Sequence, residues 1–280
     1  MALTAAPRPV GPTVWDGVSL LRGPGRAPVA VGGRLDPPTL VGAYRVGAFP
    51  WPSGEDSDGS DPDGDEAEAE VVGFRELLRA AVDARRIRHL SPSGTGGYDL
   101  PWWSPDPRAV IPAGRVRVNR SLRKRMRSCG WTTTVDASFV EVVRGCQRDG
   151  TSGWITDELI EGYTELHALG WAHSVEVWDE RDELVGGVYG VGVGGVFAGE
   201  SMFHARTDAS KIALADFDAR FTAAGGAVLD VQMMTEHLAS LGAREVPRRD
   251  YLAVLTRVRD ADVRLDRDRQ PVSRLAPPAG

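Results

Sequence analysis

The chain of 280 residues carries 33 Lys and Arg against 39 Asp and Glu, which gives a formal net charge of −6. This acidic balance argues at first against a nucleic-acid partner, because proteins that bind phosphate backbones are usually basic. With 42% hydrophobic and 26% charged residues the composition is that of a globular protein, and it excludes a collagen, a coiled coil and a largely disordered chain.

The sequence lacks two features, and their absence excludes further classes of protein. It has no run of about 18 apolar residues, and its N-terminus shows no basic stretch followed by an apolar one, so neither a transmembrane helix nor a secretory signal is predicted. Cys129 and Cys146 are too few for a disulfide framework or a four-cysteine zinc site. We therefore expect a reduced, cytoplasmic protein with buried thiols.

The first third of the chain is predicted to hold two helices separated by an acidic block. Pro37 and Pro38 suit a first helical turn, and that helix should end before Pro50. Residues 53–70 contain nine acids and no base, which predicts a disordered insertion. An amphipathic helix is predicted over residues 71–90.

Helices alternate with strands in the rest of the chain. Asp136 is predicted to cap one helix and Thr156 a second. Strands are predicted over residues 173–178, as a glycine-joined pair over 185–203, and over 227–234. This alternation favours a mixed α/β domain. The Arg- and Asp-rich tail from about residue 257 is predicted to be mobile.

Three apparent motifs are not supported by the residues around them. Residues 190–195 match a dinucleotide fingerprint, but the sequence that follows is strand-like where the fingerprint needs a helix. Residues 199–203 begin like a nucleophile elbow and end in Phe203 where glycine is required. Cys146 with a histidine could imitate a thiol protease, but Cys146 lies on an apolar helical stripe, which is typical of a buried structural thiol. The histidines lack the spacing of metal ligands. The sequence therefore predicts neither covalent catalysis nor a metal site.

Polar side chains within apolar strands are the first positive signal. Asp230 and Gln232 lie two residues apart and share one face of a predicted strand, and Glu200 occupies a similar place in another. A carboxylate in such a strand must be paired or functional. A satisfied structural pair is the alternative to a catalytic role.

A basic run is the second signal. Residues 115–127 hold seven bases and no acid. On a helix beginning near Ser121, one exposed side carries Arg120, Arg123, Lys124 and Arg127. Such a run is usually a solvated face, but the missing acids favour a phosphate-binding patch.

Several long strings resemble the leucyl/phenylalanyl-tRNA–protein transferases. They include AYRVGAFPW (43–51), WWSPDPRAV (102–110), RSLRK (120–124), FAGESMF (197–203) and DVQM (230–233), and the match extends from Gly32 to about Leu252. The resemblance implies an enzyme that transfers leucine or phenylalanine, with methionine a further candidate, from aminoacyl-tRNA to a protein's N-terminal Arg or Lys. The product would carry a degradation signal.

The resemblance also implies an α+β fold. A small N-terminal domain would span 1–112 and include the acidic insertion at about 53–70. A catalytic domain of the N-acetyltransferase-like kind would span 113–256, followed by a tail over 257–280. It implies a monomer that uses no cofactor and no metal.

The site residues implied by the resemblance fall into three groups. Asp230 would hold the attacking amine or pass charge to Gln232, which would orient the amine or the ester carbonyl. Glu200 would help to place these groups or the acceptor's positive N-terminus. The aminoacyl pocket would be formed by Val188, Phe197, Met202, Phe217 and Leu229. Trp51 and Trp154 would stack on the terminal adenosine, and acceptor-stem phosphates would meet Arg120, Arg123, Lys124 and Arg127.

Two other functions stay open at this point. An acetyl-CoA-dependent N-acetyltransferase needs a glycine-rich pyrophosphate loop, and the segment FHARTDAS (203–210) has no glycine. A non-catalytic tRNA-binding protein should have lost Asp230 or Gln232. The charge is no obstacle to RNA binding, because the chain without residues 53–70 has 33 bases and 39 − 9 = 30 acids, a balance of +3.

Overall fold

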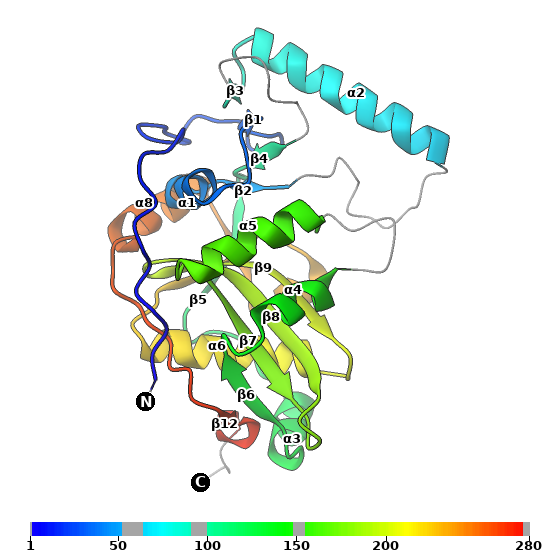
Figure 1. Ribbon diagram of the computed structural model, residues 1–280, viewed down its shortest axis with the longest axis vertical. Coiled ribbons are helices and arrows are strands. Elements are labelled where there is room, and N and C mark those ends of the chain that lie inside the picture. The colour runs from blue at the N-terminus through cyan, green and yellow to red at the C-terminus, as the bar shows by residue number, and fades with distance from the viewer. Residues whose placement is uncertain (1, 52–63, 91–99, 148–154, 277–280) are drawn as a thin grey trace.

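The computed structural model describes residues 2–51, 64–90, 100–147 and 155–276 (Figure 1). The described chain forms an eight-stranded sheet and a four-stranded sheet. From edge to edge the larger sheet contains β11 (Arg244–Val246), β5 (Arg108–Pro112), β10 (Val228–Gln232), β9 (Val196–His204), β8 (Leu184–Val193), β7 (Ala172–Trp178), β6 (Thr132–Val135) and β12 (Gln270–Pro271). The smaller sheet contains β2 (Phe49–Pro50), β4 (Pro101–Trp103), β1 (Ala30–Val31) and β3 (Arg88–His89).

The described chain also forms helices, some of which cover the two faces of the larger sheet. They are α1 (Pro37–Val46), α2 (Gly64–Asp83), α3 (Arg120–Ser128), α4 (Phe139–Cys146), α5 (Asp157–Ala168), α6 (Ala209–Ala223), α7 (Glu236–Ser240) and α8 (Arg248–Val258), with a 3₁₀ turn, η1 (Val272–Leu275). Figure 1 shows α4 and α5 in front of the strands and α6 behind them. No helix in the described part is long and apolar enough to cross a membrane.

The two faces of the sheet belong to different hydrophobic clusters. One cluster joins α1, α4, α5 and the small sheet, and it includes Leu40, Trp102 and Tyr163. The other lies between the sheet and α6 and includes Phe197 and Phe217. Pairing within the large sheet is antiparallel except between β9 and β10, which run parallel. A mixed α/β architecture, as the alternation of elements predicts, is thus confirmed.

The first predicted helix is confirmed as α1. Asp36 caps its N-terminus, because the side chain accepts a hydrogen bond from Thr39 N at 2.9 Å, and Pro37 begins the first turn. Gly47 ends the helix with φ 91°, a left-handed conformation that glycine adopts without strain. The helix therefore stops before Pro50, as predicted.

The acidic block is only partly covered by the structure. Residues 52–63 lie outside the described chain, and α2 (Gly64–Asp83) includes residues 64–70, so the prediction of disorder for 53–70 stays a prediction. The helix predicted over 71–90 ends earlier, at Asp83.

Of the two predicted helix caps, one is confirmed. Thr156 caps α5 by accepting a hydrogen bond from Leu159 N at 3.3 Å. The prediction for Asp136 is wrong, because Ser138 is the N-cap residue of α4. Asp136 has φ 57°, and its carboxylate lies 2.9 Å from His173 Nδ1 on β7. Asp136 therefore contacts the neighbouring strand instead of capping the helix that follows it.

The described part of the C-terminal tail is packed, so the prediction that it is mobile is wrong there. β12 pairs with β6, and the side chains of Leu265 and Val272 are buried in the second cluster. The carboxylate of Asp216 on α6 receives Arg220 Nε at 2.6 Å and also pairs with Arg274 of the tail. A buried acid on a distant helix thus fixes this segment.

We expect Arg274→Ala to lower the free energy of unfolding by about 1–2 kcal/mol, because it removes a charged hydrogen bond to a buried carboxylate. Arg264→Ala is the matched control, since Arg264 pairs with the exposed Asp262, and it should cost at most about 0.5 kcal/mol. Urea unfolding measures both variants. Equal effects would show that the Asp216 contact does not anchor the tail.

The domain boundary expected after residue 112 does not follow the sheets. β5 (Arg108–Pro112) lies in the larger sheet between β10 and β11. The N-terminal segment also contacts the region expected to be catalytic, since Trp171 Nε1 donates to the carbonyl of Arg8 at 2.7 Å. Both contacts cross the expected boundary, because the order of the strands in the sheet, rather than their order along the chain, decides which segments are neighbours.

Candidate active site

Strand β10 ends in a bulge that carries two of the predicted site residues. Asp230 is opposite Val110 on β5, but Gln232 is opposite Ala109, so one residue of β10 has no partner. Gln232 has φ 58°, which is uncommon for a residue other than glycine. Bulges and left-handed residues are concentrated at functional sites, where they redirect a side chain.

Asp230 is fully buried and forms an ion pair with Arg108. Arg108 Nε donates to Oδ1 at 2.7 Å and Nη2 donates to Oδ2 at 2.6 Å, which is a bidentate arrangement. Tyr251 OH donates to Oδ2 at 2.7 Å, and Gln232 N donates to Oδ1 at 3.1 Å. Four donors therefore occupy the two oxygens of the carboxylate.

Arg108 was not among the residues predicted from the sequence. Burial disfavours its charged form, but the Asp230 carboxylate raises its pKa, so the guanidinium stays charged. It also lies over the rings of Phe49 and Tyr251, 4.9 Å and 4.7 Å from their centroids, and Nη1 donates to the carbonyl of Gly47 at 3.2 Å. The signal that could have identified Arg108 in the sequence is that a buried Asp230 needs a cationic partner.

The Gln232 side chain links β10 to β9. Its Nε2 donates to the carbonyl of Gly199 at 2.9 Å. β9 is irregular at the same level, because Tyr189 pairs with Ser201 and Gly190 with Gly199, which leaves Glu200 between them. Asp230, Gln232 and Glu200 are therefore brought together where two irregular strands meet.

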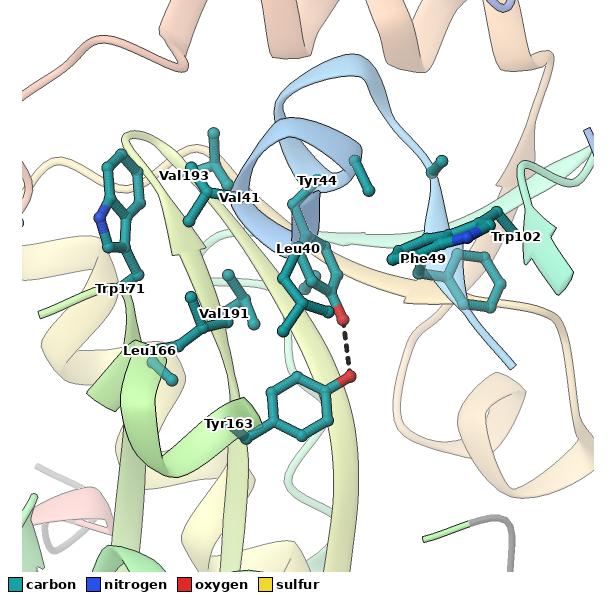
Figure 2. Packing of buried hydrophobic residues seen from close by; sticks show 14 of the residues in the cluster. Leu40, Val41, Tyr44, Phe49, Trp102, Tyr163, Leu166, Trp171, Val191 and Val193 are labelled. Atoms are coloured by element: carbon teal, nitrogen blue, oxygen red, sulfur yellow. Dashed lines mark hydrogen bonds between the residues drawn. The ribbon is translucent and has the colours of Figure 1, made fainter. Parts of the chain in front are cut away.

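The Glu200 carboxyl is linked to two tyrosines from different parts of the chain. Tyr163 OH donates to Glu200 Oε2 at 2.8 Å, and the hydroxyls of Tyr44 and Tyr163 lie 2.8 Å apart. Figure 2 shows these two hydroxyls facing each other across the interface of α1 and α5. The other oxygen, Oε1, is buried without a hydrogen-bond partner among the described residues.

Burial raises the pKa of the Glu200 carboxyl to about 7, although the nearby hydroxyls of Tyr163 and Tyr44 act in the opposite direction. A carboxyl with this pKa is about half protonated at neutral pH, so it can accept a proton and release it again. Glu200 is thus the group of this cluster suited to proton transfer, whereas the Asp230 carboxylate is occupied by its bidentate pairing with Arg108.

The five residues predicted for the aminoacyl pocket all belong to the cluster between the sheet and α6. The rings of Phe197 and Phe217 have centroids 3.9 Å apart, and Val188 is opposite Met202 on the β8–β9 hairpin. Met202 is partly exposed, while the other four, Val188, Phe197, Phe217 and Leu229, are buried. Leu229 and Asp230 are consecutive on β10 and so face opposite sides of the sheet.

The predicted RNA-binding residues do not form one cluster. Trp51 is partly buried beside Phe49, with ring centroids 6.3 Å apart, and Trp154 lies outside the described residues. The second half of the basic run forms α3, as predicted, and the side chains of Arg120, Arg123, Lys124 and Arg127 on it are exposed. Figure 1 places α3 at the end of the molecule away from α1 and α8.

No group of three or more His, Cys, Asp or Glu side chains able to hold a metal ion occurs among the described residues. The geometry that is present is a pair of irregular strands that bring the Gln232 amide and the Glu200 carboxyl, whose pKa is raised, next to the Arg108–Asp230 ion pair. Such a site can orient two reactants and move a proton, which suits acyl transfer from an activated ester to an amine.

Comparison with known proteins agrees with this chemistry. The family model described as "Leucyl/phenylalanyl-tRNA protein transferase" matches residues 110–256. A leucyl/phenylalanyl-tRNA–protein transferase from Shewanella piezotolerans is 37% identical over 241 residues, which is 85% of this chain and 84% of the relative. The one from Shigella sonnei is 39% identical over 232 residues, 82% of this chain and 81% of the relative.

A solved structure gives a weaker likeness. The structure of L-PGS from Bacillus licheniformis covers 72% of this chain and 74% of its own, with a TM-score of 0.38 and 12% identity. A likeness at this level carries no argument about the fold or the function. The assignment therefore depends on the family model and the sequence relatives.

Proposed function

The chain belongs to the leucyl/phenylalanyl-tRNA–protein transferase family, and from that premise we propose that the meeting point of Asp230, Gln232 and Glu200 is its reaction centre. The enzyme is an aminoacyltransferase that moves leucine or phenylalanine from aminoacyl-tRNA to the N-terminus of a protein. The observation that carries the proposed site is the β10 bulge, which directs Gln232 toward β9 beside a buried carboxyl.

The reaction needs little beyond positioning and a route for one proton. The acceptor's α-amine attacks the ester carbonyl of the aminoacyl-tRNA, an amide bond forms, and the C–O bond to the terminal ribose breaks. The amine loses one proton and the ribose oxygen gains one, so no cofactor is required. An α-amine has a reference pKa of about 7.7–8.0, and a useful fraction is already neutral at pH 7.

Within this reaction Gln232 orients the ester carbonyl or the amine, and Glu200 accepts the amine's proton through its free oxygen, Oε1. Asp230 is a positioning residue: its carboxylate accepts a hydrogen bond from Gln232 N at 3.1 Å and pairs with Arg108. Glu200 also attracts the positive N-terminus of the acceptor before the reaction.

Several finer assignments complete the proposal. The acceptors begin with Arg or Lys, and the modified proteins are marked for degradation. The aminoacyl side chain enters the cluster that contains Phe197, Met202 and Phe217, whose flexible methionine suits both Leu and Phe. The face of α3 binds acceptor-stem phosphates. The protein acts as a monomer in the cytoplasm, and its large sheet forms an acyltransferase unit of the N-acetyltransferase-like kind.

The direct test is transfer of labelled phenylalanine from Phe-tRNA to a peptide with N-terminal Arg. We expect transfer to peptides that begin with Arg or Lys and none to the same peptide acetylated at its N-terminus, because acetylation removes the nucleophile. Comparing Leu-, Phe- and Met-tRNA gives the donor preference. Binding of tRNA without any transfer would favour a non-catalytic tRNA-binding protein instead.

We expect Glu200→Gln to remove one inflection from the pH profile of transfer. In the parent protein the carboxyl is protonated below a pH of about 7 and cannot accept the amine's proton, so the rate should fall as the pH is lowered. Glutamine keeps the size of the side chain and does not titrate. The variant should transfer more slowly and show only the inflection of the acceptor amine near pH 8.

Glu176→Gln is the matched control for that experiment. Burial raises the pKa of the Glu176 carboxyl to about 7 as well, but this group accepts hydrogen bonds from Ser174 and Thr134, away from the proposed reaction centre. Its variant should keep the pH profile of transfer unchanged. Loss of the inflection in both variants, or in neither, would remove Glu200 from the proton route.

A further inference from the structure

We propose that Arg115, Arg117 and Arg244 form a cationic strip that binds phosphates of the single-stranded 3′ end of aminoacyl-tRNA, between α3 and the reaction centre. The proposal rests on the proposed function and adds a second stretch of RNA contact to it. Its evidence is the way two segments, residues 113–119 and 241–246, are held together at the β11 edge of the large sheet.

The first segment presents its arginines by alternation. Val116 and Val118 pack against the cluster that lies under α6, while Arg115 and Arg117 are exposed. The backbone is fixed, because the carboxylate of Asp218 accepts hydrogen bonds from Gly114 N at 2.7 Å and Val116 N at 3.1 Å. The two arginines therefore project from an anchored backbone.

The second segment lies directly against the first. Arg117 N donates to the carbonyl of Leu241 at 2.8 Å. A Cβ atom added at Gly242, where φ is 104°, would come within 2.8 Å of the Arg115 carbonyl oxygen and 3.2 Å of Arg117 Cγ. Two residues further on, Arg244 begins β11 with its side chain exposed.

The strip connects the two places where the donor must be held. Its first segment leads directly into α3, whose N-cap is Asn119. At its other end Arg244 is opposite Val110, which is itself opposite Asp230, so these three residues occupy one row across β11, β5 and β10. An aminoacyl ester at the 3′ terminus must reach that row while the duplex stem contacts α3.

The arginines of the strip differ from several other exposed arginines of this chain, which form ion pairs. Arg206, Arg264 and Arg269 each have a carboxylate oxygen within 3.0 Å, from Asp179, Asp262 and Asp182 respectively. Within the described ranges no carboxylate forms an ion pair with Arg115, Arg117 or Arg244. Glu245 is the nearest acid in sequence, and it alternates with Arg244 along β11. These charges are free to meet phosphate.

The test compares two donors that differ in phosphate: Phe-tRNA and phenylalanyl-adenosine, which carries the same ester without any phosphate. We expect the variant Arg115→Ala/Arg117→Ala/Arg244→Ala to raise KM for Phe-tRNA about tenfold at low salt and to leave kcat unchanged. The slope of log affinity for tRNA against log salt should shrink by about 2, at about 0.7 for each contact to a single strand. With phenylalanyl-adenosine its kinetics should equal those of the parent protein.

Arg257→Ala on α8 is the control, because Arg257 is also exposed and lies outside the strip. Equal losses with both donors, or an unchanged salt slope, would overturn the proposal. Failure of the unsubstituted protein to transfer from either donor would instead contradict the proposed function. If the triple variant does not fold, Arg115→Ala alone should reduce the slope by about 0.7, and an unchanged slope would also overturn the strip.

Discussion

Replacing Arg108 by alanine should lower the free energy of unfolding by about 3–5 kcal/mol, which is the usual cost of leaving a buried charge without its partner. Both side chains of the Arg108–Asp230 pair are only 1% exposed. After the substitution the Asp230 carboxylate keeps the hydrogen bonds from Tyr251 and Gln232 but loses its countercharge. Urea unfolding followed by circular dichroism measures the change.

A matched control is Arg45→Ala. Arg45 also pairs with an aspartate at 2.7 Å, but the two side chains are 33% and 71% exposed, so solvent screens the interaction and the loss should be at most about 1 kcal/mol. Asp230→Ala should resemble Arg108→Ala, and the double variant should cost clearly less than the sum of the two. Additive costs would show that the pair is not coupled.

Replacing Gln232 by alanine should reduce the rate of transfer about 10²–10³-fold, the usual effect of removing one oriented polar group from a reaction centre. The stability cost should be much smaller than for Arg108, because the hydrogen bond that is lost joins a neutral side chain to the Gly199 carbonyl. Single-turnover transfer at saturating Phe-tRNA separates the chemical step from binding.

Gln232→Glu is a useful companion, because it keeps the side chain's length but replaces the amide donor with a carboxylate that would face the Gly199 carbonyl. We expect it to be at least as slow as the alanine variant. A rate close to that of the parent protein for either substitution would contradict the role given to Gln232. Activity alone would be a poor test of Asp230, since any substitution there also strands Arg108.

Local features of this fold were predictable where the determining contacts are close in sequence. The first turn of α1, the cap of α5 and the exposed face of α3 follow from residues within one or two turns. The β8–β9 hairpin, with Gly194 at φ 55°, follows from a run of glycines, and its strand pairing excludes the dinucleotide fingerprint. These interactions are encoded in short patterns, and the structure confirms them.

The features that were missed depend on contacts between distant residues. Asp136 contacts His173 instead of capping a helix, and Asp216 on α6 fixes a tail that reads as polar and mobile. Arg108 pairs with Asp230 because β5 lies beside β10, and strand order cannot be derived from local pattern. In the same way, the intermediate pKa of Glu200 follows from burial by surrounding elements.

The most direct test of the reaction centre is a structure of the protein bound to a stable amide analogue of phenylalanyl-adenosine. Our account predicts the amide carbonyl or amine within hydrogen-bond distance of the Gln232 side chain. The phenyl ring should lie beside Phe197 and Phe217, and the adenosine should point toward the strip formed by Arg115, Arg117 and Arg244. An analogue bound elsewhere, with Gln232 and Glu200 free of contact, would contradict the account.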